Sequence, residues 1–206
     1  VAVLAGSDWA DPVAGVRRAR QQGREIVLDA TDPAAVARAL GEVDAVVNCV
    51  AGSPDAMTAG ARALATALDT RAARLVHFSS MAVYGAARGD IAEDHPLAPN
   101  LQGYGGAKAE AEKLLAARDT VVTLRPGCIY GPDSPQWSLR IADLLRAHRI
   151  GDLGAAGDGC SNLVYIDDVV AAVLAGLRAP TGAAAYNLAM ADAPDWNGYF
   201  LAYARA

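Results

Sequence analysis

The feature that most constrains this 206-residue chain is the alternation of short apolar segments with alanine-rich segments. Two of the segments, DAVVNCV at 44–50 and TVVTL at 120–124, are almost continuously apolar. A strand with one face in water would alternate apolar and polar residues, whereas a continuous apolar run indicates a strand that is covered on both faces. The pattern therefore predicts the α/β class, with a doubly wound parallel sheet between two layers of helices.

The alternation also predicts where the elements lie. Strands are expected at 1–5, 25–29, 44–50, 74–80, 120–126, 162–166 and 184–189. Helices are expected near 12–22, 33–40, 55–68, 104–117, 136–148, 168–178 and 195–205. A chain of this length most simply makes one domain, so we expect a single domain over 1–206. The polar segment 85–103 is a long loop, and loops of this length in compact domains are often functional.

Composition and charge narrow the range of partners. The net charge of −5 does not favour nucleic-acid binding, which usually shows a basic stripe. The longest apolar run, VVAAVLAGL at 169–177, is about half as long as a membrane span, and no signal peptide opens the sequence. The three cysteines are odd in number and far apart, which argues against a disulfide framework. We therefore expect a cytoplasmic protein that binds neither nucleic acid nor membrane.

The segment GYGGAK at 103–108 places Tyr104 four residues before Lys108, one of only two lysines in the chain. Residues four apart share a helix face, so the phenol and the ammonium can point into one cleft. An ammonium near a phenol favours the tyrosinate, which brings the phenol toward the range useful for acid–base catalysis. The alternative is that Tyr104 packs near the helix start and that Lys108 is solvated.

Ser79 and Ser80 end the strand expected at 74–80. In open parallel sheets, ligands bind beyond the carboxyl ends of the strands, so these hydroxyls lie where chemistry is expected. A hydroxyl at a strand end can donate to a substrate carbonyl oxygen and polarise it. The alternative is that the serines only satisfy the backbone of the following turn.

Four segments in this order and spacing resemble the extended short-chain dehydrogenase/reductases, also called the NAD-dependent epimerase/dehydratase family. They are SSMAVYG at 79–85, YGGAK at 104–108, LRPGCIYGP at 124–132 and NLVYIDDVV at 162–170. Residues 28–52 resemble the family's third strand, helix and fourth strand. The resemblance implies a Rossmann-type fold that uses NAD or NADP to move a hydride between nicotinamide and a carbonyl or alcohol of a small-molecule or sugar substrate.

The resemblance also implies roles for individual residues. Ser80, Tyr104 and Lys108 correspond to the catalytic triad, and Ser80 is preferred to Ser79 because it lies four residues before Tyr84. The implied cofactor-binding residues are Asp29, Ala30, Cys49, Val50, Ala51, Tyr104, Lys108 and Pro126. Substrate-binding elements are expected mainly in 127–162 and 184–206, and no metal site is expected.

A homodimer is expected through the helices at 55–68 and 104–117, because many family members dimerise through the corresponding pair. Small residues on these helices would allow two copies to pack closely, namely Ala59, Gly60, Ala107 and Ala111.

The family's glycine-rich phosphate loop is absent from the sequence. GDLGAAG at 151–157 imitates it, but it follows an expected helix and precedes an expected strand, whereas a phosphate loop joins a strand to a helix. The simplest interpretation is that residues 1–5 are the family's second strand and that the first strand is missing. Alternatively, residues 1–5 are the first strand and Asp29 ends the second. A protein that keeps the fold but has lost the cofactor is the non-catalytic alternative.

Three departures from the family bear on the substrate. Met81-Ala82 stand where the 4,6-dehydratases carry Asp-Glu, so dehydration is not expected. Sugar-nucleotide epimerases usually carry an Asn near Cys128 and an Arg-Asp pair near Ser161, and both are replaced here. The lost arginine would have bound a diphosphate with two parallel hydrogen bonds. These changes favour a carbonyl reductase acting on a less charged substrate, with a sugar-nucleotide epimerase proper as the alternative.

The choice between NAD and NADP depends on which alignment holds. If residues 1–5 are the second strand, its end at Ala5-Gly6 lacks the acidic residue that NAD-selective enzymes place on the ribose. Arg17 or Arg18 could then reach a 2′-phosphate, which favours NADP or the use of both cofactors. In the other alignment Asp29 binds the ribose and favours NAD.

Overall fold

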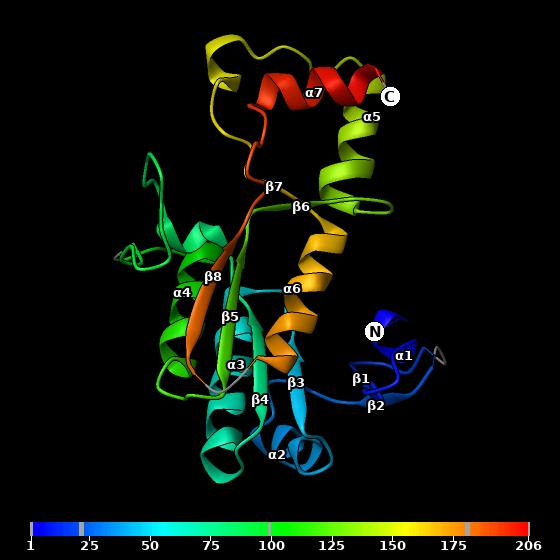
Figure 1. Ribbon diagram of the computed structural model, residues 1–206, viewed down its shortest axis with the longest axis vertical. Coiled ribbons are helices and arrows are strands. Elements are labelled where there is room, and N and C mark those ends of the chain that lie inside the picture. Colours follow the sequence, from blue (N-terminus) through cyan, green and yellow to red (C-terminus); the bar gives the residue numbers. More distant parts are fainter. Residues whose placement is uncertain (1, 21–22, 99, 180–181, 206) are drawn as a thin grey trace.

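The centre of the computed structural model, which describes residues 2–20, 23–98, 100–179 and 182–205, is a four-stranded parallel sheet (Figure 1). The strand order is β3-β4-β5-β8, and neighbouring strands run parallel throughout. The strands are β3 (Ala45–Asn48), β4 (Arg74–Phe78), β5 (Val121–Pro126) and β8 (Ala184–Leu188). All four agree with the expected strands to within a few residues at each end.

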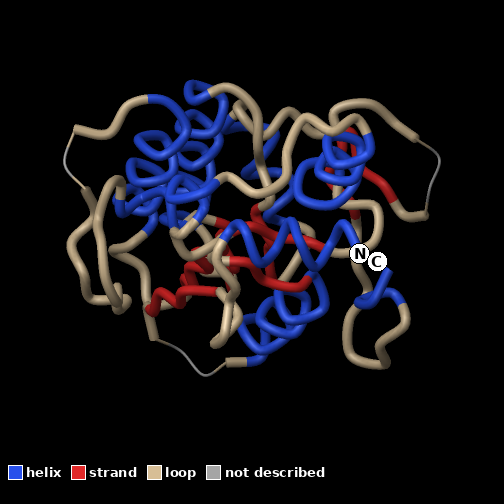
Figure 2. Tube along the Cα trace, turned by 90° about the horizontal axis from the view of Figure 1, so that it is seen from above, coloured by secondary structure: helices blue, strands red, loops and turns tan. Residues whose placement is uncertain are grey.

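Helices cover both faces of this sheet, as the view from above shows (Figure 2). One face carries α2 (Pro33–Gly41), α3 (Pro54–Thr70) and α4 (Gly103–Leu115), and the other carries α6 (Ile166–Arg178) (Figure 1). Leu75 of β4 is fully buried on the α3 and α4 side, and the next residue, Val76, is fully buried against α6. Both faces of β4 are thus buried, and burial on both faces explains why strands of this sheet have continuous apolar sequences. The predicted doubly wound α/β class is confirmed.

The starts of α2 and α3 follow ordinary capping chemistry. The carboxylate of Asp32 accepts a hydrogen bond from Ala34 N, and the hydroxyl of Ser53 accepts one from Ala56 N. Each cap is followed by a proline at the first helical position, Pro33 and Pro54, where the missing N–H has no helical partner to lose.

A smaller layer lies beyond the carboxyl ends of the main strands, at the top of Figure 1. It contains the parallel pair β6 (Cys128–Tyr130) and β7 (Leu163–Tyr165), the π-helical turn η2 (Pro135–Leu139), α5 (Arg140–Arg146), the 3₁₀ turn η3 (Gly154–Gly157) and α7 (Trp196–Arg205). Its own core is formed by the buried side chains of Ile141, Leu163, Tyr199 and Phe200.

The structure corrects the sequence-based expectations at the N-terminal end. Residues Ala2–Ala5, expected as a strand, form the short helix α1, while Val1 lies outside the described residues. The helix expected near 12–22 is wrong, because Ala14–Val16 form strand β1, which pairs in parallel with β2 (Glu25–Val27); residues 21–22 are not described. Short apolar runs cannot be assigned by periodicity alone, and the ladder between β1 and β2 decides the outcome here.

Two further elements were not expected from the sequence. Cys128–Tyr130 form β6, and Met81–Tyr84 form the 3₁₀ turn η1. The helix expected at 136–148 is divided into η2 and the shorter α5. Within the described ranges, no helix is long and apolar enough to cross a membrane.

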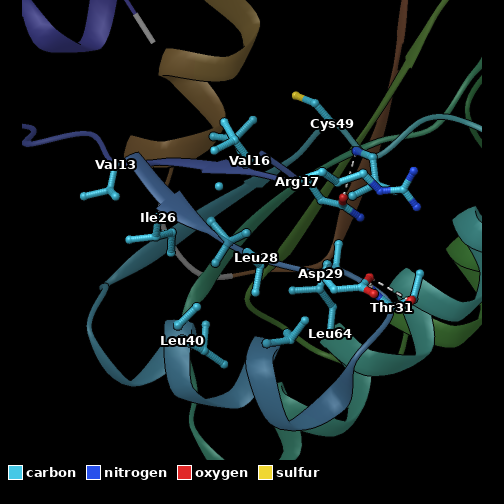
Figure 3. Close-up of a pocket in the computed structure, with 18 of the residues that line it drawn as sticks. Val13, Val16, Arg17, Ile26, Leu28, Asp29, Thr31, Leu40, Cys49 and Leu64 are labelled. Atoms are coloured by element: carbon cyan, nitrogen blue, oxygen red, sulfur yellow. Dashed lines mark hydrogen bonds between the residues drawn. The ribbon is translucent and has the colours of Figure 1, made fainter. Parts of the chain in front are cut away.

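The sheet comes in separate pieces. β1 and β2 form one sheet, β3-β4-β5-β8 form the main sheet and β6-β7 form a third, and no strand joins β2 to β3 among the residues described. A pocket of about 630 Å³ separates the β1-β2 sheet from the main sheet, and residues of β1, β2 and β3 line it (Figure 3). Apolar side chains of β1, of β2 and the residue after it, and of α2 and α3 line the pocket, including Val16, Ile26, Leu28, Leu40 and Leu64.

Candidate active site

The helix α4 brings Lys108 to the carboxyl end of β4, with Tyr104 one turn earlier on the same helix. Its first turn lies against η1, because a Cβ at Gly105 would be only 2.8 Å from the Ala82 carbonyl oxygen. Any larger residue at 105 would push the helix away, so the glycine permits this close approach. Tyr104 is therefore held beside the turn that begins at Ser80.

Lys108 is buried, whereas half of Tyr104 is exposed. The Lys108 ammonium donates a hydrogen bond to the carbonyl oxygen of Phe78 at 2.7 Å, and its Nζ lies 5.8 Å from the centre of the Tyr104 ring. Burial lowers the pKa of Lys108, while the Cys49 thiol and the Glu112 carboxylate act in the opposite direction. The structure thus brings together the two residues that the sequence paired, with the lysine anchored and the tyrosine facing outward.

Ser80 lies at the point where β4 ends and η1 begins. Its Oγ accepts a hydrogen bond from Ala82 N at 3.2 Å, so it does satisfy the turn, as the alternative interpretation expected. Accepting that bond does not use the hydroxyl hydrogen, which can still be donated to a ligand. The capping role and the catalytic role are therefore compatible.

His77 lies beneath this region and is 2% exposed. Burial and the nearby Lys108 ammonium lower its pKa to about 3, so the ring stays neutral at ordinary pH. Its Nδ1 lies 3.1 Å from the side-chain nitrogen of Asn48, whose oxygen accepts a hydrogen bond from Val50 N. That arrangement makes Nδ1 the acceptor and agrees with the interpretation of His77 as a packed residue.

Five of the six residues expected to bind cofactor outside α4 line the pocket between the β1-β2 sheet and the main sheet: Asp29, Ala30, Cys49, Val50 and Ala51. They follow the carboxyl ends of β2 and β3, while Pro126 ends β5 on the far side of β4. Burial raises the pKa of the Cys49 thiol, and the Lys108 ammonium acts in the opposite direction, although Lys108 itself does not line the pocket. Sequence spacing alone could not place these strand ends in one pocket.

The polar rim of the pocket contains two residues of opposite charge (Figure 3). Asp29 accepts hydrogen bonds from the backbone N–H of Thr31 at 2.9 Å and from its hydroxyl at 2.8 Å. These bonds, with a smaller contribution from Arg17, lower the pKa of Asp29. Arg17 follows directly after β1 and also lines the pocket. The sequence analysis missed Thr31, which orients the carboxylate.

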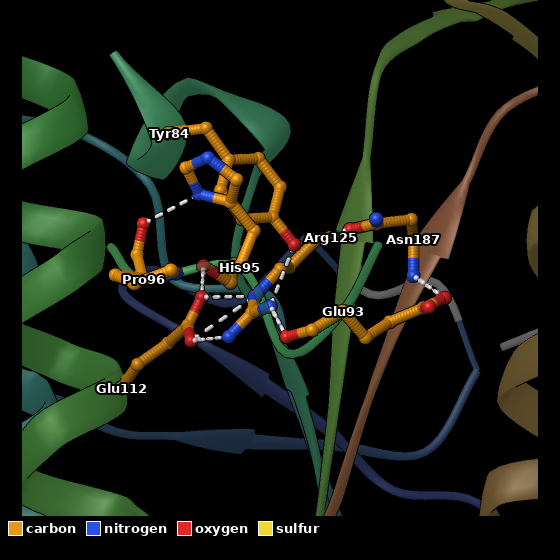
Figure 4. Close-up of polar contacts among 8 residues, drawn as sticks. Tyr84, Glu93, His95, Pro96, Glu112, Arg125 and Asn187 are labelled. Carbon is orange, nitrogen blue, oxygen red and sulfur yellow. Dashed lines mark hydrogen bonds and ion pairs between the residues drawn. The ribbon is translucent and has the colours of Figure 1, made fainter. Parts of the chain in front are cut away.

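A buried polar network next to the site was also missed (Figure 4). It is centred on Arg125 of β5 and Glu112 of α4, whose side chains are 7% and 6% exposed. It includes Tyr84 and two residues that anchor the long loop, Glu93 and Asn187. A signal was present in the sequence, since Glu112 continues the four-residue spacing of Tyr104 and Lys108.

The network makes the attachment of the loop at 85–98 dependent on pH. The carboxylate of Glu93 accepts a hydrogen bond from Asn187 N, and this bond, with one from its own backbone N–H and a smaller contribution from Arg125, lowers the pKa of Glu93 below its ordinary value of 4.5. A lowered pKa stabilises the folded state above pH 4.5, and this contribution is lost as pH falls through the folded-state pKa. We expect proteolysis of the loop to accelerate below that pH. In Glu93→Gln this pH dependence should disappear; an unchanged profile would contradict the assignment.

Comparison with known proteins identifies the family. The sequence profile of the NAD dependent epimerase/dehydratase family matches residues 3–189. The chain belongs to this family. Its resemblance to the extended short-chain dehydrogenase/reductases is thereby confirmed, and the nicotinamide cofactor class, NAD or NADP, agrees with it.

Two curated relatives of this family member are ketoreductases by name. One is the 4-hydroxy-2-methyl-3-oxo-4-farnesyl-3,4-dihydroquinoline-1-oxide ketoreductase of Stigmatella aurantiaca, 36% identical over 93 residues, which are 42% of this chain and 28% of the relative. The other is the probable dTDP-4,6-dihydroxy-2-methyloxan-3-one 4-ketoreductase of Streptomyces antibioticus, 37% identical over 121 residues, which are 50% of this chain and 41% of the relative. Each match spans less than half of the curated relative.

Two solved structures that hold NAD share the fold. MoeE5 in complex with UDP-glucose and NAD is 27% identical, with a TM-score of 0.78 over 95% of this chain and 73% of that one. WbmG of Bordetella bronchiseptica in complex with NAD is 24% identical, with a TM-score of 0.73 over 87% of this chain and 62% of that one. The second likeness concerns the fold alone.

The expected homodimer remains a prediction, but three of the small residues named for it are used within one copy. Gly60, Ala107 and Ala111 are buried in the single chain, and a Cβ at Gly60 would lie 3.4 Å from the Ala30 carbonyl oxygen. Their small size therefore serves the packing of α3 and α4 inside the chain.

Proposed function

We propose that this protein is an NAD(P)-dependent carbonyl reductase. The observation that carries the proposal is the anchoring of Lys108, whose buried ammonium lies 5.8 Å from the ring of the outward-facing Tyr104. A lysine solvated at the surface would have no such geometry. The names of the two curated relatives, both ketoreductases, support reduction over epimerisation.

Three residues of the chain have separate roles in the proposed reduction: Tyr104, Ser80 and Lys108. A bound reduced nicotinamide supplies the hydride to the carbonyl carbon. The Tyr104 hydroxyl, half exposed beside η1, donates the proton that the carbonyl oxygen takes up. The Ser80 hydroxyl hydrogen orients and polarises that oxygen. The Lys108 ammonium, fixed by the Phe78 carbonyl, stabilises the negative charge left on the phenol oxygen.

The pocket between the β1-β2 sheet and the main sheet suits the adenosine end of the cofactor. Val50 and Ala51 offer apolar contact, and the carboxylate of Asp29 keeps acceptor sites beyond its bonds to Thr31. For the pyrophosphate, the described part of the chain has no strand-to-helix turn with spaced glycines. The segment at 151–157 lies between α5 and β7, so it does not supply one. Residues are therefore assigned to the adenosine end of the cofactor, in the pocket, and to its nicotinamide end, at Tyr104 and Lys108. No residues are assigned to its diphosphate.

We propose further that the cofactor is NADP rather than NAD. The sequence analysis took residues 1–5 as the strand whose end faces the ribose, but in the structure the strand before β2 is β1. The residue that follows β1 is Arg17, where NAD-selective enzymes place an acid. Arg17 and Arg18 are both exposed, but only Arg17 lines the pocket. A guanidinium at this position can bind the 2′-phosphate with charge-assisted hydrogen bonds.

Arg17→Ala is expected to weaken NADP⁺ binding by about tenfold while leaving NAD⁺ binding within a factor of about two. The reason is that a hydrogen bond to a charged group contributes about 1.5–3 kcal/mol, and only NADP⁺ carries the added phosphate. Titration of the full-length protein with each cofactor measures both constants. Arg18→Ala is the matched control and should change neither. Tighter NAD⁺ than NADP⁺ binding in the unaltered protein would refute the preference and support Asp29 as the ribose ligand.

The proposed reaction is tested with full-length protein, both reduced cofactors and a panel of cyclic and aryl ketones, by following the oxidation of the nicotinamide. Consumption of cofactor that requires a ketone supports the proposal. Inversion of a UDP-sugar without ketone reduction would instead establish the epimerase alternative. Failure to bind either cofactor would establish the non-catalytic alternative.

A further inference from the structure

Glu112 occupies the third position of a stripe along one face of α4. Tyr104, Lys108 and Glu112 follow one another at four-residue intervals, and the stripe becomes more buried along the helix. Tyr104 is half exposed, while Lys108 and Glu112 are 5% and 6% exposed. The helix face that carries the catalytic pair therefore ends on a buried carboxylate.

Arg125 of β5 meets this carboxylate with two nitrogens (Figure 4). Its Nη2 donates to Glu112 Oε2 at 2.7 Å, and its Nε lies 3.1 Å from Oε1 and 3.2 Å from Oε2. The forked geometry of a guanidinium fixes both the distance and the orientation of a carboxylate. The rotation of α4 about its own axis is thus fixed relative to the sheet.

Glu112 is also bonded to the strand end that carries the candidate serine. The Ser79 hydroxyl donates to Glu112 Oε1, and Ser79 is the residue before Ser80. Glu112 lies on α4, the helix that bears Tyr104 and Lys108, and its carboxylate contacts the segment that bears Ser80. A shift of Glu112 would move these groups relative to one another.

The other side of Arg125 holds the loop beyond η1. Its Nη1 donates to the Tyr84 hydroxyl at 2.7 Å and to the Glu93 carbonyl oxygen at 2.9 Å. The guanidinium carbon also lies 5.2 Å from the centre of the Tyr84 ring. The Tyr84 hydroxyl donates in turn to Asn187 Oδ1 on β8 at 2.8 Å. The network thereby joins β4, η1, the loop, α4, β5 and β8.

Stability alone gives little reason for an ion pair at this depth. Taking two charges out of water costs several kcal/mol each, and well-packed apolar residues of similar volume often replace such pairs without loss. A buried network whose members are all bonded does, however, hold its partners in one arrangement. The pair is therefore better explained by the geometry that it imposes.

We propose that Glu112 and Arg125 are positioning residues for catalysis, which set Ser80 against Tyr104 and Lys108. The proposal rests on the carbonyl reductase function for its catalytic consequence. Neither residue needs to touch the substrate, because each acts through the groups that it holds.

The decisive variant is the double replacement Glu112→Leu with Arg125→Met, which removes both charges and leaves no uncompensated ion. Asp69→Asn is the control, because it breaks the Arg118–Asp69 ion pair, which joins the end of α3 to the segment after α4 and includes none of the network residues. Two readouts are taken on full-length proteins whose melting temperatures match that of the unaltered protein. They are hydrogen exchange of the amides in 79–85 and 103–108, and the separate kcat and KM for a ketone found active.

The double variant should exchange at least tenfold faster in both segments, and its kcat should fall at least tenfold with KM within about threefold. The control should match the unaltered protein in both readouts. A double variant with unaltered exchange, or with faster exchange and unaltered kcat, would overturn the proposal.

If the double variant does not fold, Glu112→Gln, which keeps the shape and loses the charge, takes its place under the same criteria. If the unaltered protein reduces no ketone, the proposed function fails, and hydrogen exchange alone then decides whether the pair holds the two segments.

Discussion

Replacing Tyr104 by phenylalanine is expected to reduce turnover by about 10²–10⁴-fold while leaving cofactor affinity nearly unchanged. Only the hydroxyl is removed, so the ring keeps its place beside Lys108 and η1. The loss is large because, among the described residues, no other tyrosine hydroxyl lies beside the anchored Lys108 ammonium to donate the proton. Steady-state kinetics and cofactor titration on the full-length protein measure the two effects separately.

Tyr186→Phe is the matched control for this experiment. Tyr186 is 49% exposed, close to the 50% of Tyr104, but it lies on β8. Its replacement should leave kcat within about twofold. A Tyr104→Phe enzyme with near-normal kcat would remove the basis of the proposed mechanism, whatever the behaviour of the control.

Replacing Leu115 by alanine should lower the free energy of unfolding by about 2–5 kcal/mol. Leu115 is fully buried at the end of α4, in the cluster that joins this helix to α3, β4 and β5. The lost side chain removes apolar contact and leaves a cavity that the surrounding layers cannot fill. Urea unfolding followed by circular dichroism measures the change.

Replacing an exposed leucine by alanine is the control, because it shortens the same side chain without leaving a buried cavity. Leu201 of α7 is 54% exposed, so Leu201→Ala should change the free energy of unfolding by no more than about 0.5 kcal/mol. Equal losses in the two variants would show that α4 is not held by the cluster around Leu115. Because α4 carries Tyr104 and Lys108, the same result would weaken the account of how the site is held.

Much of the candidate site follows from local sequence. Tyr104 and Lys108 are four residues apart in a helix, and helix geometry alone puts them on one face. The continuous apolar runs at β3 and β5 predicted a sheet covered on both sides, and the burial of Leu75 and Val76 on opposite faces of β4, between these strands, confirms it. Residue patterns determine such features because they depend on spacings of a few positions along the chain.

The sequence by itself determined the α/β class, the paired Tyr104 and Lys108 and the membership of a nicotinamide-dependent family. Tertiary structure decided which short apolar run becomes a strand, because Ala14–Val16 gain a ladder partner in β2 and Ala2–Ala5 do not. It also decided that Arg17 meets the pocket and that Arg125 of one strand reaches Glu112 of another element. These contacts join residues that are not neighbours in the chain, so they exist only once the elements have packed together. For Arg125 and Glu112 the physical reason is that a buried charge requires a partner that satisfies it.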